Sequence, residues 1–266
     1  MDVLARNNVN VVGVEGGPTL LLAHGFGCDQ NLWRRVVDRL DTKFRIVLMD
    51  HVGAGASDAR AWNEQKYSTL RGYADDVIDV VHDLGVRDVV LVGHSVAAMI
   101  GALAVIADPE PFAKLVMLTP SPRYLDDGDY RGGFSRADID ELLDSMEANY
   151  LGWSHGMAPV IMGNADRPEL SDELDASFCR TDPDRARVFA RATFLSDNRD
   201  DLALVPVPTL VVECAHDAIA PRTVGAYVHS RVPDSTLITL EASGHCPHVS
   251  HPDATAQAIA EFVTSP

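Results

Sequence analysis

The sequence lacks the cysteine patterns that mark a disulfide framework or a zinc module. Its 266 residues contain only four cysteines, without paired spacing, at positions 28, 179, 214 and 246. Unpaired thiols are typical of reducing compartments, so we expect a cytoplasmic protein with free cysteines. Cys246 lies near His248 and His251, but a proline-broken loop does not give these side chains the spacing of a metal site. We therefore predict no metal, and we expect both histidines to form loop hydrogen bonds.

Basic residues and long apolar runs are also scarce. Lysine and arginine total 22 against 39 acidic residues, and the net charge of −17 argues against nucleic acid and anionic membranes as partners. No stretch has the length of a transmembrane helix, and residues 1–6 have no signal-peptide core. The glycine loop at 50–58 lacks the third glycine and the following helix of a dinucleotide site, so we predict no cofactor. The length fits one large α/β domain with an insertion.

The most informative segment present is Gly-His-Ser-Val-Ala at 93–97. It joins an apolar run at 88–92, predicted to be a strand, to an apolar run at 97–107, predicted to be a buried helix. A serine at such a sharp turn is typical of the nucleophile elbow of α/β-hydrolases, because its hydroxyl is open and a helix N-terminus lies behind it. Ala97 replaces the usual last glycine and is small enough for that position. Ser95 is the predicted nucleophile; a serine in an ordinary tight turn is the alternative.

A serine nucleophile needs a histidine base and a carboxylate that orients the histidine. Asp217 follows the predicted strand 209–214, and His245 follows the predicted strand 237–240. Both residues therefore lie at the sheet edge where open α/β sheets place their sites, in the chain order that hydrolases use. Asp126, the first carboxylate after the strand at 114–119, is the alternative acid.

The remaining parts of the site are an oxyanion hole and a pocket. A predicted strand at 18–23 leads directly into His-Gly-Phe-Gly at 24–27, whose glycines permit a close approach of the backbone. We assign the oxyanion donors to the N–H groups of Phe26 and Val96, with the Phe26 ring on the pocket floor. The predicted substrate-binding residues are Phe26, Tyr124, Phe134, Leu142, Trp153, Met157, Phe194 and Ile219.

The strand–helix alternation is interrupted by a helical insertion. After the strand at 114–119, helical patterns occupy 136–148, 150–162, 168–179 and 183–195. We predict a mostly parallel, eight-stranded-type sheet with helices on both faces. The core would comprise residues 1–122 and 198–266. Residues 123–197, inserted after the sixth strand, would form a four-helix lid over Ser95.

Several segments together resemble one branch of the α/β-hydrolases. They are HGFG at 24–27, GHSVAAMIG at 93–101, SPRY at 121–124, YRGGF at 130–134 and GHCPH at 244–248. This branch holds the bacterial general-stress regulatory hydrolase and the plant strigolactone and karrikin receptors. The resemblance implies a V-shaped lid of four helices, a Ser-Asp-His triad and slow hydrolysis of esters or lactones. It also implies that some members bind a small molecule and contact a signalling protein.

These observations predict a serine hydrolase that cleaves a small apolar ester or lactone. The alternative is a slow-turnover receptor or stress-signalling regulator that uses the same pocket and contacts a protein partner through its lid. Haloalkane dehalogenases and epoxide hydrolases need an aspartate nucleophile, which Ser95 excludes. Members of the haloperoxidase type and members that cleave C–C bonds use serine, and they stay open as alternatives.

Overall fold

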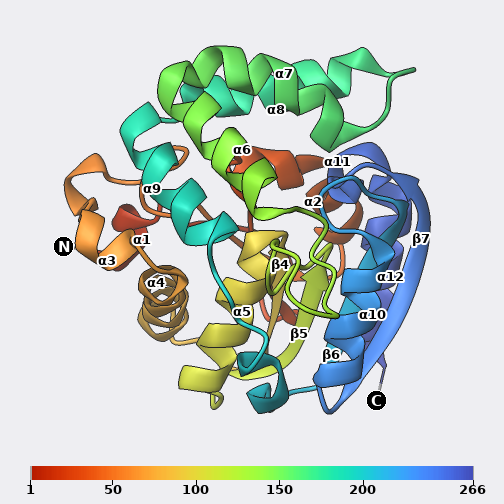
Figure 1. Cartoon of the computed structure of the whole chain (residues 1–266). Helices are drawn as coiled ribbons and strands as arrows, with labels where there is room; N and C mark the ends of the chain where they lie inside the picture. Colours follow the sequence, from red (N-terminus) through yellow and green to blue (C-terminus); the bar gives the residue numbers. More distant parts are fainter. Residues whose placement is uncertain (1, 266) are drawn as a thin grey trace.

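A seven-stranded sheet runs through the centre of the computed structural model, which describes residues 2–265 (Figure 1). The strand order is β1-β3-β2-β4-β5-β6-β7. Only β1 is antiparallel to its neighbour, β3; the other pairs are parallel. The strands are β1 Asn10–Gly13, β2 Thr19–Ala23, β3 Arg45–Met49, β4 Val89–His94, β5 Phe112–Leu118, β6 Thr209–His216 and β7 Ser235–Ser243.

Helices cover both faces of this sheet because its central strands are apolar on both sides, as parallel strands usually are. Every residue of β2 and β4 is buried. One apolar cluster joins the sheet to α4 and α5, and a second joins it to α2 and α12. The helices outside the insertion are α1 Val3–Arg6, α2 Arg34–Leu40, α3 Glu64–Tyr67, α4 Leu70–Asp83, α5 Val96–Ala107, α10 Arg222–Arg231, α11 Pro247–Ser250 and α12 Pro252–Thr264.

The insertion between β5 and β6, a stretch that the structure describes throughout, contains four α-helices. They are α6 Arg136–Ala148, α7 Tyr150–Met162, α8 Pro168–Arg180 and α9 Pro183–Phe194. Ser135 begins α6 with a capping box, and Asp182 caps α9 ahead of a proline at its first position. α7 packs against α8, and α6 packs against α7 and α9. In Figure 1, α6, α7 and α8 lie above the sheet, at the end where β4 leads into α5.

The mostly parallel sheet with helices on both faces was predicted correctly, but two details differ. Residues 2–265 form seven strands rather than eight, and the insertion follows the fifth of them rather than the sixth. The physical reason lies at the N-terminus, where residues 3–6 form the short helix α1, capped by the Asp2 side chain, and no described strand precedes β1. None of the helices in residues 2–265 has the length and apolar character that crossing a bilayer requires.

Candidate active site

Ser95 lies in a strained turn between β4 and α5. Its φ of 57° and ψ of −124° fall where L-residues are rare, and such strain is concentrated at functional sites. The Ser95 N–H donates to the Leu118 carbonyl of the neighbouring strand at 2.8 Å, which anchors the turn. A Cβ at Gly93 would lie 2.2 Å from the Ala97 carbonyl oxygen, so only glycine fits there. The turn therefore directs the Ser95 hydroxyl away from the sheet edge.

The side chains of Ser95, His245 and Asp217 form a continuous hydrogen-bonded chain. Ser95 Oγ lies 2.7 Å from His245 Nε2, and His245 Nδ1 lies 2.7 Å from Asp217 Oδ2. The other carboxylate oxygen of Asp217 accepts the N–H groups of Ile219 and Ala220 at 2.8 and 3.1 Å. Asp126, the alternative acid, bonds instead to the Gly133 N–H in an exposed loop.

Asp217 is held as a carboxylate although its side chain is fully buried. Burial by itself would raise its pKa, but the charge and hydrogen bond of His245 and the two backbone N–H groups together lower it. An ionised Asp217 accepts the proton on His245 Nδ1, so Nε2 is left unprotonated and faces Ser95 Oγ. This is the tautomer that a general base for Ser95 requires.

Three further residues fix the backbone of His245, and sequence reasoning missed all three roles. His94 Nε2 donates to the His245 carbonyl at 2.9 Å, and Thr119 Oγ1 lies 3.1 Å from the same oxygen. The His245 N–H donates to the Ile161 carbonyl of α7 at 2.8 Å. His94 is the residue before Ser95 in the elbow motif, so the motif itself contained a signal, but the partner of its ring depends on the folded structure.

The N–H groups of Phe26 and Val96 are available near Ser95. Within residues 2–265 neither donates a hydrogen bond to another group, and Val96 is the first residue of α5, where N–H groups have no intrahelical partner. A Cβ at Gly25 would lie 2.6 Å from His94 Nδ1, so glycine lets this loop approach the elbow. Two free donors beside a nucleophile are suited to bind a developing oxyanion.

An apolar pocket lies between the insertion and the sheet edge, with Ser95 and His245 in its wall and about 520 Å³ of empty space, counting its open mouth. Seven of the eight predicted binding residues line it: Phe26, Tyr124, Leu142, Trp153, Met157, Phe194 and Ile219. Phe134 does not line it; its ring packs behind Tyr124, with the centroids 6.5 Å apart. The lining residues that we did not predict are Cys28, His94, Ile161, Leu174, Phe178, Thr193 and Cys246.

The groups that could compete with Ser95 as reactive residues are held neutral. Burial raises the pKa of the Cys246 and Cys28 thiols, which therefore stay protonated. The Tyr124 hydroxyl lies 3.4 Å from Ser95 Oγ, and burial raises its pKa to about 12. It is therefore a neutral phenol that can donate a hydrogen bond near the nucleophile.

The interpretation of His248 as a loop hydrogen-bonder is wrong. Neither of its ring nitrogens has a partner among residues 2–265, and the ring packs against Trp33 and His94, with centroid distances of 4.6 and 4.3 Å. His251 does form a hydrogen bond, at 2.9 Å to Ser250 Oγ. The short helix α11 places the His248 ring inside the core. Because Pro247 indicated an irregular loop, this position of the ring could not be predicted from the sequence.

Three buried histidines near the site make stability depend on pH. Burial lowers the pKa of His94 to about 3 and lowers the pKa values of His51 and His248 well below 6.5. Above pH 6.5 neither the folded nor the unfolded state protonates these rings, so stability is at its full value. Below it the unfolded chain takes up protons and the folded one does not, so stability is lost as pH falls toward the folded pKa.

We expect the free energy of unfolding to fall by about 4 kcal/mol between pH 7.5 and 5.5 from these three residues, about 1.4 kcal/mol each. Urea titrations at the two pH values measure this difference. His248→Leu should remove about one third of it, and the exposed His216→Gln is the matched control. An equal pH dependence in wild type and His248→Leu would contradict the prediction.

A parallel sheet, an elbow serine and a Ser-His-Asp chain at the sheet edge together define the α/β-hydrolase class. A family model described as the alpha/beta hydrolase family matches residues 20–258. The chain belongs to this family.

Individual proteins of known sequence or structure are similar to the chain over nearly its whole length. The chain is 41% identical to a strigolactone esterase D14 of Arabidopsis thaliana, over 96% of each chain. It is 36% identical to the karrikin insensitive 2 receptor CA of Petunia hybrida, over 97% of this chain and 95% of the relative. Among solved structures, the hydrolase olei00960 of Oleispira antarctica superposes with a TM-score of 0.96 at 40% identity, covering 100% of this chain and 97% of that one.

Proposed function

We propose that the protein is a serine hydrolase that cleaves a small apolar carboxylic ester or lactone. The observation that carries this proposal is the unbroken chain from Asp217 through His245 to Ser95, which ends in an apolar pocket beside two free backbone donors. The name of one relative, a strigolactone esterase, supports the hydrolysis of an ester.

The reaction follows from the positions of these groups. Ser95 Oγ attacks the carbonyl carbon while His245 Nε2 takes its proton, and the Phe26 and Val96 N–H groups bind the oxyanion. His245 then returns the proton to the leaving alcohol, which in a lactone stays attached to the acyl chain. Water, deprotonated by His245, attacks the acyl-enzyme, and His245 gives that proton to Ser95 Oγ as the bond to the acyl carbon breaks and the acid is released. Asp217 stabilises the imidazolium in both steps.

Residues 123–197 form the lid of this site in our proposal. Their helices supply most of the apolar lining, through Leu142, Trp153, Met157 and Phe194, whereas the catalytic groups come from the core. Such a wall selects a compact apolar body with one polar reactive group. The free cysteines fit a cytoplasmic location, which we also propose.

A panel of small esters and lactones tests the proposal. We expect hydrolysis of at least one short apolar ester or lactone, with charged esters of similar size cut more slowly, because a charged group loses its hydration in this pocket. The initial rate for each substrate is measured from the amount of acid or alcohol product formed. A panel with no hydrolysis by the folded protein, or with charged esters preferred, would contradict the assignment.

A receptor function with slow turnover is the second candidate. It is favoured by the relatives that are named receptors and by two exposed apolar side chains on α7, Leu151 at 51% and Val160 at 49% exposure. A signalling protein would contact the exposed surface of the lid. Single-turnover release followed by a stalled second turnover, together with a ligand-dependent change in lid proteolysis, would favour the receptor. Steady multiple turnover without such a change would favour the enzyme.

Two aromatic side chains of the lid should set the accepted substrate size. Phe194 and Trp153 contact the Phe26 ring, with centroid distances of 5.8 and 6.1 Å, and both line the pocket. We expect Phe194→Ala and Trp153→Ala to lose about 1–3 kcal/mol of transition-state binding for the best small substrate and to gain bulkier ones.

The matched control is Phe134→Ala, which removes an aromatic ring that packs behind the pocket wall. The measurement is kcat/KM across a series of increasing acyl size. If the two pocket variants cut every substrate in the wild-type order, these rings only pack helix on helix. If Phe134→Ala changes the preferred substrate size as much as the two pocket variants do, the change does not come from the pocket wall.

A further inference from the structure

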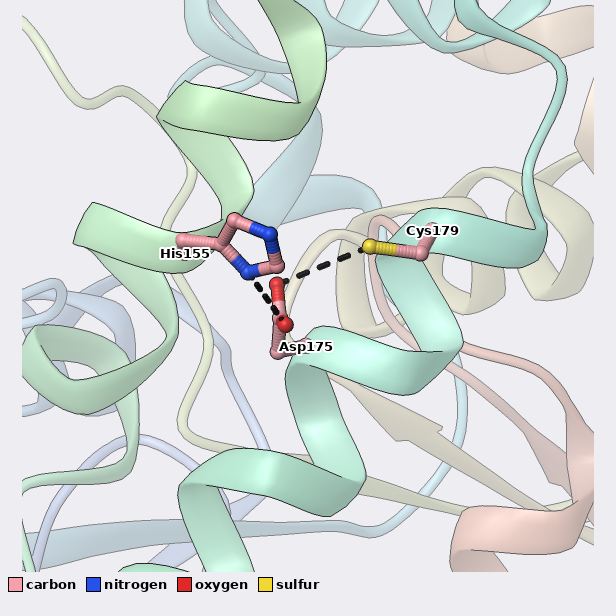
Figure 2. A group of neighbouring side chains, drawn as sticks. All are labelled: His155, Asp175 and Cys179. Atoms are coloured by element: carbon pink, nitrogen blue, oxygen red, sulfur yellow. Dashed lines mark hydrogen bonds and ion pairs between the residues drawn. The ribbon is translucent and has the colours of Figure 1, made fainter.

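Three side chains of types that bind metal ions lie close together within the insertion, where α7 packs against α8. Figure 2 shows His155 on α7 and Asp175 and Cys179 on α8 directed toward one another. His155 Nδ1 lies 2.5 Å from Asp175 Oδ2, and Cys179 Sγ lies 3.7 Å from Asp175 Oδ1. One ligand atom from each residue lies within 4.8 Å of the other two. None of the three residues lines the pocket of the candidate active site.

We propose that this cluster binds a zinc ion. Thiolate, imidazole and carboxylate are the three donor types that zinc prefers, and three protein ligands leave one tetrahedral position for water. Zinc bond lengths of about 2.0–2.3 Å place tetrahedral ligand atoms about 3.3–3.8 Å apart. The distance from Cys179 Sγ to Asp175 Oδ1 already lies in this range, and the imidazole, at 2.5 Å from Asp175 Oδ2, must move outward to make room for the ion. The His155 side chain is 64% exposed and therefore free to do so.

The scaffold aligns the ligands before the ion arrives. Asp175 and Cys179 are four residues apart on α8, so both face the same neighbouring helix. The buried Ser154 hydroxyl lies 2.8 Å from Asp175 Oδ1 and 3.5 Å from Cys179 Sγ. Ser154 thus orients the carboxylate as an outer-shell group does in established metal sites. Binding releases the Cys179 thiol proton to solvent, and zinc takes its place.

A zinc ion here would link the two helices that form one wall of the pocket. Other side chains of the same helices line the pocket, namely Trp153 and Met157 from α7 and Leu174 and Phe178 from α8. Fixing α7 to α8 restricts the opening of this wall, so zinc should slow ligand entry. This regulatory effect rests on the proposed hydrolase function, whereas zinc binding itself does not.

Calorimetric titration of the reduced 266-residue protein with zinc chloride tests the site. We expect one equivalent to bind per chain. Loss of an outer-shell group alone costs 10–100-fold in metal affinity, so His155→Ala and Cys179→Ser should each weaken binding by about 100-fold or more. His82→Ala is the matched control, because His82 is an exposed histidine paired with Asp108 at 2.5 Å but is not part of the cluster.

Spectroscopy and thermal melting provide independent readouts. Cobalt(II) in place of zinc should give a thiolate-to-cobalt absorption band in wild type and His82→Ala and none in Cys179→Ser. Zinc should raise the melting temperature of wild type and leave that of Cys179→Ser unchanged, because an ion that binds only the folded state stabilises it. Equal zinc affinity in wild type, His155→Ala and Cys179→Ser would overturn the site, as would the absence of a cobalt band.

Hydrolysis rates at saturating zinc test the regulatory role. Wild type should be slowed and Cys179→Ser, which keeps the whole catalytic chain, should not. Equal rates in wild type with and without zinc would overturn the coupling to the pocket. A metal-free protein that hydrolyses no ester yet binds zinc with the expected variant pattern would contradict the proposed function and support the metal site.

Discussion

Replacing Ser95 with alanine should reduce ester hydrolysis by about 10⁶-fold in kcat while the fold is retained. The variant keeps the oxyanion donors and the pocket, but it has no atom that can bond to the carbonyl carbon. His245 then has no serine hydroxyl to deprotonate, and only a weak reaction with water remains. Because the partners of Ser95 Oγ within residues 2–265 are the side chains of His245 and Tyr124, its removal disturbs no backbone contact among them. The measurement is kcat on the best substrate of the ester and lactone panel.

A matched control separates the loss of a nucleophile from the loss of a buried serine. Ser121 is also buried near the end of a central strand, but its hydroxyl donates to the Arg123 carbonyl rather than to a catalytic group, so Ser121→Ala should keep most of the activity. A fluorophosphonate probe should label Ser95 in wild type and should label nothing in Ser95→Ala. Full activity in folded Ser95→Ala would refute the role that we assign to Ser95.

The catalytic candidates could be predicted because each depends on a local pattern with one structural outcome. Ser95, Asp217 and His245 each follow an apolar run, and parallel strands bring their carboxyl ends to one edge of the sheet. The chain order then assigned the roles. The helices of the insertion were also predictable, since Ser135, Pro168 and Asp182 mark where three of them begin.

The pocket wall and the zinc ligands could not be predicted in the same way. The face that an insertion helix turns to the pocket depends on how α6–α9 pack together, and this packing decides that Phe178 lines the pocket. Phe134 precedes α6 and pairs with Leu125 in an isolated β-bridge, outside the pocket wall. Leu174 and Phe178 do recur at helical spacing, a signal for burial but not for a pocket. His155 and Cys179 are far apart in sequence and meet only because α7 packs on α8.

Replacing Asp217 with asparagine should reduce kcat by about 10⁴-fold, as loss of the corresponding carboxylate does in serine proteases. The Ile219 and Ala220 N–H groups point at one side-chain oxygen and would hold the amide carbonyl of the variant there. The amide NH₂ then faces His245 Nδ1 and donates to it, so the ring proton moves to Nε2. A protonated Nε2 cannot accept the proton of Ser95 Oγ, although all distances are unchanged.

Asp126→Asn is the control for this variant, because it removes a carboxylate from the loop after β5 without approaching His245. Its activity should stay close to that of wild type. The loss in Asp217→Asn should appear in kcat with little change in KM, since the pocket wall is intact, and the fluorophosphonate probe should react more slowly by a similar factor. If Asp217→Asn stays active and Asp126→Asn does not, the acid is Asp126, and the loop after β5 must move toward His245 when substrate binds.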